Sequence, residues 1–252
     1  MESIANSENA PGIFVFGNIE AMTAAFFDIL VDEFTLALAG KKTYHIALSG
    51  GSTPLRIFEY LARMPLGRIR WDFLHIYWGD ERCVPKDDPE SNYGNAWKTL
   101  LRLIDIPPEN IHRIHGEADP NKESLRYSEV LRKYPPVMNG LPLFDLVLLG
   151  LGEDGHTASI FPDSLDMITS DELCYVATHP QTKQKRISFS LKLINNSRKI
   201  IFLVTGASKA KIVGDILSHK SGFEKFPASY VKATSGELKW FLDAKAVEGL
   251  EK

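Results

Sequence analysis

Residues 144–157 read FDLVLLGLGEDGHT, and this stretch decides the fold class. It begins with a predominantly apolar run, Phe144 to Leu149, and then enters a glycine-rich loop. A short apolar run without polar alternation is typical of a strand that is buried on both faces of a parallel sheet. The loop is therefore expected at the carboxyl end of such a strand, which is where open α/β sheets bind their ligands.

Three more apolar runs of this kind occur, at 44–48, 73–78 and 200–204. Helical patterns lie before and between the runs, at 18–39, 54–63, 92–104, 122–134 and 207–218. This alternation predicts an α/β fold, namely a three-layer, Rossmann-like, mostly parallel sheet with helices on both faces. Later runs are expected to extend the sheet or to form an antiparallel edge, at 186–191, 229–232 and 238–242.

The proline and glycine turns along the chain mark no shift in composition. A length of 252 residues fits one α/β domain or two small ones. We therefore expect a single domain over residues 13–252, preceded by a flexible leader of residues 1–12.

The composition is that of an ordinary globular protein, with 44% hydrophobic and 24% charged residues. A net charge of -3 gives no general drive toward nucleic acid or a membrane surface, so we expect neither partner. Two distant cysteines, Cys83 and Cys174, suggest neither a disulfide framework nor a cysteine metal site. With no secretory signal pattern at the N-terminus, these features predict a cytoplasmic protein whose oligomeric state is open.

The loop after the run at 44–48 contains two glycines just before a predicted helix. Its residues are Ser49, Gly50, Gly51, Ser52, Thr53 and Pro54. The glycines permit close backbone approach, Thr53 is expected to cap the helix, and Pro54 suits its first turn. Because a helix start presents N–H groups and the positive end of a dipole, this loop is a candidate phosphate site.

Three cationic side chains are expected near the same edge of the sheet. Arg82 follows the run at 73–78, where its guanidinium can face substrate oxygens while Asp80 or Glu81 holds it in place. Solvated turn charges are the alternative for this loop. Lys209 is expected in the first turn of a helix, where an anion would favour its charge, and Arg186 precedes a strand and is expected to face inward.

Asp154 and His156 lie in the glycine-rich loop that opened this description. A lone histidine is more often structural, but this one follows an acid that can orient it and raise its basicity. His156 is therefore a candidate general base, and Thr157 is expected to start the next helix.

Other histidines and serines carry less chemistry in the sequence. His112-x-x-His115 lacks a further acid or cysteine ligand, so no metal is assigned, and His75 alternates within a predicted strand and is expected in the core. The absence of a G-x-S-x-G elbow weakens a covalent mechanism at Ser52 or Ser159.

These segments together resemble the 6-phosphogluconolactonases, which are related in fold to the glucosamine-6-phosphate deaminases. The resemblance rests on several motifs in order, at 49–54, 78–85, 91–94, 144–162, 186–190, 204–210 and 227–229. It implies that His156 activates water with support from Asp154. It also implies that Arg82, Arg186, Lys209 and the 49–53 loop hold substrate oxygens and phosphate.

The activity implied by this resemblance is hydrolysis of 6-phospho-D-glucono-1,5-lactone, a small sugar phosphate, with no metal or organic cofactor. One alternative is a deaminase of glucosamine 6-phosphate. Such enzymes resemble Asp-Glu-Tyr and Gly-His-Ile-Ala-Phe-Asn-Glu at loops where this chain has Asp80-Glu81-Arg82 and a segment that begins Gly155-His156-Thr157. A second alternative is a sugar-phosphate sensor without catalysis, but no helix-turn-helix pattern precedes the first helix.

Overall fold

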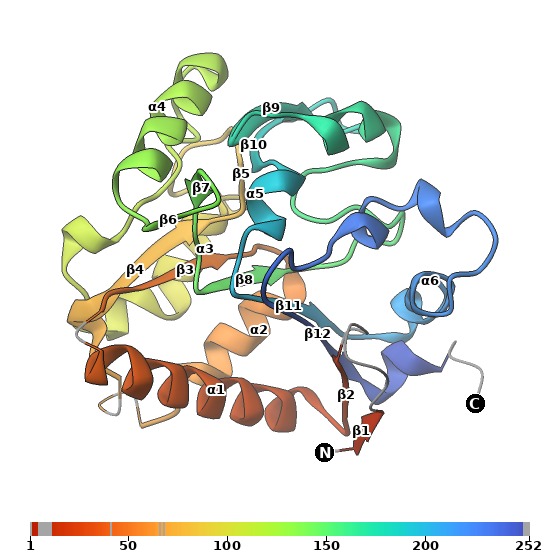
Figure 1. The fold of residues 1–252 in the computed structure, drawn as a ribbon, viewed down its shortest axis with the longest axis horizontal. Helices are drawn as coiled ribbons and strands as arrows, with labels where there is room; N and C mark the ends of the chain where they lie inside the picture. The colour runs from red at the N-terminus through yellow and green to blue at the C-terminus, as the bar shows by residue number, and fades with distance from the viewer. Residues whose placement is uncertain (1, 5–11, 41, 66, 68, 249–252) are drawn as a thin grey trace.

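The computed structural model describes residues 2–4, 12–40, 42–65, 67 and 69–248. Its main sheet has the strand order β1-β2-β12-β11-β8-β3-β4 (Figure 1). The six strands from β2 to β4 in this order are parallel, and only β1 runs antiparallel to its neighbour. The strands are β1 (Glu2–Ile4), β2 (Gly12–Phe16), β3 (Tyr44–Leu48), β4 (Leu74–Trp78), β8 (Leu146–Leu149), β11 (Lys199–Val204) and β12 (Glu237–Asp243).

Helices cover both faces of this sheet, which confirms the predicted fold class (Figure 1). The α-helices are α1 (Ile19–Ala39), α2 (Ser52–Leu61), α3 (Asn92–Thr99), α4 (Pro120–Lys133), α5 (Leu191–Asn195) and α6 (Ala210–Leu217). Helix α1 packs against α2 on one face, while α4 and α5 lie on the other. Helix α1 has the predicted ends, because the Asn18 side chain accepts a hydrogen bond from the Ala21 N–H and Gly40 follows its last turn.

A second, antiparallel sheet of order β5-β10-β9 lies beside the main one. It consists of β5 (Asp80–Arg82), β9 (Cys174–Thr178) and β10 (Lys185–Phe189), and a short hairpin joins β6 (Val137–Met138) to β7 (Leu141–Pro142). The predicted run at 186–191 thus forms the centre of an antiparallel sheet, and the run at 238–242 lies inside the parallel one. The strand expected at 229–232 is wrong, because a 3-10 helix occupies Pro227–Tyr230 and Pro227 has no N–H for a ladder.

The N-terminal leader predicted over residues 1–12 is only partly described by the structure. Glu2–Ile4 do not belong to a free leader but form β1, which pairs with Ile13–Val15 of β2. An edge strand presents unpaired backbone groups with which an extended segment can pair, and this is the physical reason for the difference. Residues 1 and 5–11 lie outside the described residues.

The core of the main sheet is built from the apolar runs that the sequence marked. Every residue of β3 and β8 is buried, as expected for strands covered on both faces. Phe202 and Trp240, on the adjacent strands β11 and β12, stack with their ring centroids 4.0 Å apart. Within the described residues, no helix is both long and apolar enough to cross a membrane.

Candidate active site

The chain reverses its direction of sheet growth between β3 and β8. From β3 the next parallel strand, β4, is added on one side, whereas β8 is added on the other. Loops that leave the carboxyl ends of strands at such a switch point diverge and open a crevice between them. The predicted loops follow four neighbouring strands of the sheet, β11, β8, β3 and β4, so their side chains meet at this crevice.

The crevice is a cavity of about 320 Å3, which we call the polar pocket. The predicted site residues that line it are Ser49, Gly50, Gly51, Ser52, Thr53, Arg82, His156, Arg186 and Lys209. Asp154, the remaining predicted residue, contacts His156 from behind the lining. The sequence therefore placed all of these residues at one edge, and the tertiary structure brings them together.

The loop after β3 presents the start of α2 to the pocket. Gly51 is the N-cap residue with φ of 95°, a conformation that glycine adopts without strain, and no side chain caps the helix. The expectation that Thr53 caps the helix is wrong. Its hydroxyl instead lies 2.8 Å from that of Thr205, because the loop after β11 approaches from across the sheet. The uncapped N–H groups at this helix start are suited to an anion.

His156 and Asp154 form a hydrogen-bonded pair in the loop after β8. Their Nδ1 and Oδ1 atoms are 2.6 Å apart, and the same carboxylate accepts the backbone N–H of His156. Burial raises the pKa of Asp154, but the hydrogen bonds and charge of His156 outweigh it and lower the pKa to about 2. The carboxylate is therefore ionised, holds the proton on Nδ1 and leaves Nε2 as a base.

Two glycines of this loop are required by close contacts. A Cβ at Gly152 would lie 2.1 Å from Nδ1 of His156, and one at Gly155 would lie 2.6 Å from the Phe226 ring. Gly155 also has φ of 84°. Thr157 does not start a helix as expected. Its hydroxyl donates to the Gly150 carbonyl and fastens the loop on itself instead.

Arg186 and Asp80 are buried together at one wall of the pocket. Their Nη1 and Oδ2 atoms are 4.0 Å apart, and the Ser159 hydroxyl donates to the same Asp80 oxygen at 2.7 Å. Burial lowers the pKa of Arg186 while the Asp80 charge opposes that change, so the guanidinium remains a cation. Asp80 is a pocket residue that the sequence did not separate from its neighbour.

Glu81 has a different role from Asp80 because successive residues of a strand point to opposite sides. Its carboxylate accepts the backbone N–H groups of Arg82, Asn92 and Tyr93 and thereby ties β5 to the start of α3. Burial raises its pKa, and these three hydrogen bonds oppose the shift. Recognition of 80–82 as a strand would have placed Asp80 and Arg82 on one face and Glu81 on the other.

Two more cations complete the pocket. Nη1 of Arg82 donates to the Glu90 carbonyl at 2.7 Å, which fixes the direction of the side chain. Lys209, at the end of the turn that opens α6, lies 3.7 Å from the exposed Glu153 carboxylate. Burial lowers the pKa of Lys209, and Glu153 counteracts the effect. The pocket thus presents three cationic side chains together with a hydrogen-bonded histidine–aspartate pair.

A family model described as glucosamine-6-phosphate isomerases/6-phosphogluconolactonase matches residues 17–240. The chain belongs to this family. It is 44% identical over 221 residues to a 6-phosphogluconolactonase of Haemophilus influenzae, an alignment that covers 87% of this chain and 93% of that protein.

Solved structures place the family's fold on this chain as well. A 6-phosphogluconolactonase from Trypanosoma brucei is 30% identical with a TM-score of 0.84, over 97% of this chain and 100% of that one. A monomeric glucosamine-6-phosphate deaminase is 22% identical with a TM-score of 0.78, over 94% and 99% of the two chains. At that identity the deaminase shows only that the fold is shared, so the activity has to be argued from the pocket.

Proposed function

We propose that the chain hydrolyses 6-phospho-D-glucono-1,5-lactone to 6-phospho-D-gluconate, a step of the oxidative pentose phosphate pathway. The observation that carries the proposal is the His156–Asp154 pair, which lies in the same pocket as an uncapped helix start and three cationic side chains. A base and a separate anion site are what hydrolysis of a phosphorylated ester requires. The relative from Haemophilus influenzae, which bears the name of this activity, supports the same reaction.

The phosphate is proposed to bind where the loops after β3 and β11 meet. The start of α2, Lys209 and the hydroxyl pair of Thr53 and Thr205 lie at this end of the pocket. Backbone N–H groups and an ammonium group suit a phosphate dianion. Arg186 and Arg82, on the side of β5 and β10, are then left for the oxygens of the sugar ring and its carbonyl.

The proposed reaction begins when Nε2 of His156 removes a proton from a water molecule that attacks the lactone carbonyl. Attack converts the carbonyl into a tetrahedral oxyanion, and the Arg82 guanidinium stabilises the charge that develops there. One well-placed donor of this kind contributes about 3 kcal/mol. The protonated His156 then donates to the departing ring oxygen, while Asp154 stabilises the imidazolium. Neither a metal nor an organic cofactor enters these steps.

Deamination of glucosamine 6-phosphate is disfavoured by the segment after His156. The deaminase pattern ends in a glutamate five residues after its histidine, and Phe161 occupies that position here. Phe161 is 1% exposed, and its ring centroid lies 5.0 Å from that of His156. An apolar ring therefore fills the place where a second acid would have to act. Ammonia release from glucosamine 6-phosphate is the assay that would contradict this assignment.

The decisive experiment is lactone turnover by His156→Ala, with spontaneous hydrolysis subtracted. Loss of a general base predicts that kcat falls by about 10²- to 10⁴-fold. His219→Ala, which removes an exposed histidine far from the pocket in sequence, is the matched control and should retain normal turnover. Near-normal turnover by a folded His156→Ala enzyme would disprove the role of the histidine.

We also propose a cytoplasmic location for the protein. Both cysteines, Cys83 and Cys174, are free in the structure, and free thiols are typical of a reducing compartment. Fractionation of cells that express the chain would test this.

A further inference from the structure

A second and larger cavity lies outside the polar pocket, and we call it the aromatic cavity. It measures about 550 Å3 and shares no lining residue with the polar pocket. Its walls are α3 with the turns that follow it, the segment 111–115, and the outer half of α4. It therefore sits beside β4, the edge strand of the main sheet, rather than at the switch point.

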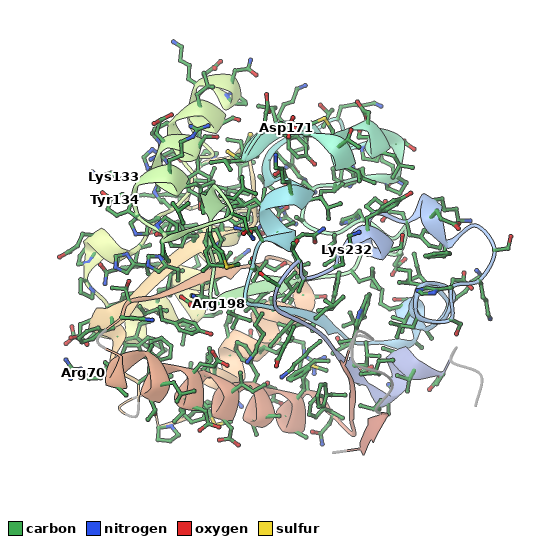
Figure 2. The ribbon with its side chains drawn as sticks, in the orientation of Figure 1. Arg70, Lys133, Tyr134, Asp171, Arg198 and Lys232 are labelled. Carbon is green, nitrogen blue, oxygen red and sulfur yellow. The ribbon has the colours of Figure 1, made fainter. Side chains whose placement is uncertain are left out.

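Aromatic rings line this cavity and remain accessible. Tyr93 and Trp97, one turn apart on α3, have ring centroids 6.2 Å apart, and Tyr134 packs on His112 at 4.4 Å. Trp97 is 42% exposed and Tyr134 is 41% exposed, whereas Trp71, Trp78 and Trp240 are buried. Figure 2 shows Tyr134 at the end of α4, on the outer edge of the molecule. Accessible aromatic faces in a concave site are suited to stacking on a flat ligand.

The charged groups that line the aromatic cavity are all basic. They are Arg102, Arg113, Arg126 and His115, and no carboxylate belongs to the described lining. Arg113 lies over the Tyr93 ring at 5.4 Å and binds both carboxylate oxygens of Glu117. Its guanidinium is therefore held in a fixed orientation at the wall.

Arg126 and Arg102 differ in how they are held. Two donors of Arg126 reach the buried Glu123 carboxylate at 2.6 and 2.5 Å, so its charge is balanced. Arg102 is exposed and makes no ion pair within the described part of the chain. The cavity thus has one unbalanced cation at its rim, next to the rings, and this favours an anionic ligand.

From these contacts we propose that the aromatic cavity is a second ligand site, which binds a small planar aromatic anion. The aromatic part would stack between Trp97 and Tyr134, and its phosphate or carboxylate would pair with Arg102. A volume of about 550 Å3 lies within the range of small-molecule sites. Aromatic phosphates and aromatic carboxylates share this chemistry, and the test separates them.

Calorimetric titration of the intact protein tests the site with four probes. Adenosine monophosphate and benzoate each combine a ring with an anion, whereas adenosine has only a ring and inorganic phosphate only a charge. We expect at least one aromatic anion to bind saturably, at least 10-fold more tightly than either control, because stacking and a charge-assisted hydrogen bond act together. Which of the two binds identifies the source of the anion. Absence of saturable binding by both would overturn the proposal.

Variants then locate the binding. Arg102→Ala and Trp97→Ala should each weaken binding of the better probe by about 10-fold. Arg132→Ala, which removes an exposed arginine of α4 that is paired with Glu129, should leave it unchanged. Melting temperatures of all three variants verify the fold. Binding that neither lining variant weakens, or that 6-phospho-D-gluconate displaces, would place the anion elsewhere and refute the site.

Discussion

The polar pocket and the aromatic cavity lie on the same sheet, yet only the smaller of them has the groups for hydrolysis. The polar pocket, at about 320 Å3, gathers loops from four strands, whereas the aromatic cavity, at about 550 Å3, lies between helices at the edge. Each contains histidine. The difference is that His156 is paired with an ionised carboxylate, while His112 is stacked among rings. Convergence of polar groups at a switch point, rather than volume, distinguishes the catalytic site.

The most severe test of this comparison is a methyl group placed behind His156. In Gly152→Ala the new Cβ would occupy space 2.1 Å from His156 Nδ1 and 2.5 Å from Asp154 Oδ1. The pair must separate or move, so kcat should fall by about 10²-fold or more. Steady-state lactone hydrolysis measures this. Gly17→Ala, where nothing lies within 4 Å, is the control, and an active Gly152→Ala enzyme would show that the pair is not needed.

A smaller effect is expected from the phosphate end of the polar pocket. Lys209→Met should raise KM by about 10- to 100-fold, because it removes a charge-assisted hydrogen bond that forms equally in the ground and transition states. Lys211→Met, on the exposed side of the same helix, should leave KM unchanged. A change confined to kcat would instead assign Lys209 to the reacting oxygens.

The histidines near β4 should make the protein sensitive to acid. Burial, followed by the charge of His75, lowers the pKa of His45 to about 3. Burial in the same way lowers the pKa of His112 to about 4. Both side chains bind protons more readily when unfolded, at a pKa of about 6.5. Stability is therefore full above pH 6.5 and is lost as the pH falls toward these folded-state values.

Denaturant titration at pH 7.5 and pH 5 measures this loss. Each of the two histidines should contribute on the order of 1–2 kcal/mol of destabilisation at pH 5. His45→Gln should reduce the difference between the two pH values, whereas His219→Ala, on an exposed turn, should not. Equal pH dependence in all three proteins would mean that the stacked histidines are not responsible.

The smallest effect should come from the aromatic cavity when lactone turnover is the readout. Trp97→Ala and Arg102→Ala are expected to keep kcat/KM within about twofold of the parent, since both side chains are exposed and neither lines the polar pocket. The lactone assay applied to these variants measures it. A loss of 10-fold or more would show that α3 couples the two regions and would end their separation.

Much of the fold could be predicted from local sequence patterns. The apolar runs at 44–48 and 200–204 form interior strands within a residue of the predicted bounds, and Asn18 and Gly40 mark the two ends of α1. The strand expected at 229–232 was wrong because Pro227 favours a 3-10 turn over a ladder. Such signals are local, since periodicity and turn chemistry act over a few neighbouring residues.

The sequence by itself determined the class of sheet, the loops that carry chemistry, and the residues His156, Arg82, Arg186 and Lys209 as candidates within those loops. Only the tertiary structure decided that β3 and β8 are neighbours, which makes a single pocket of the loops. It also decided that Asp80 faces the pocket while Glu81 ties β5 to α3, and that Thr53 meets Thr205. The physical reason is that these contacts join segments up to 152 residues apart, so their geometry depends on how the whole sheet is assembled.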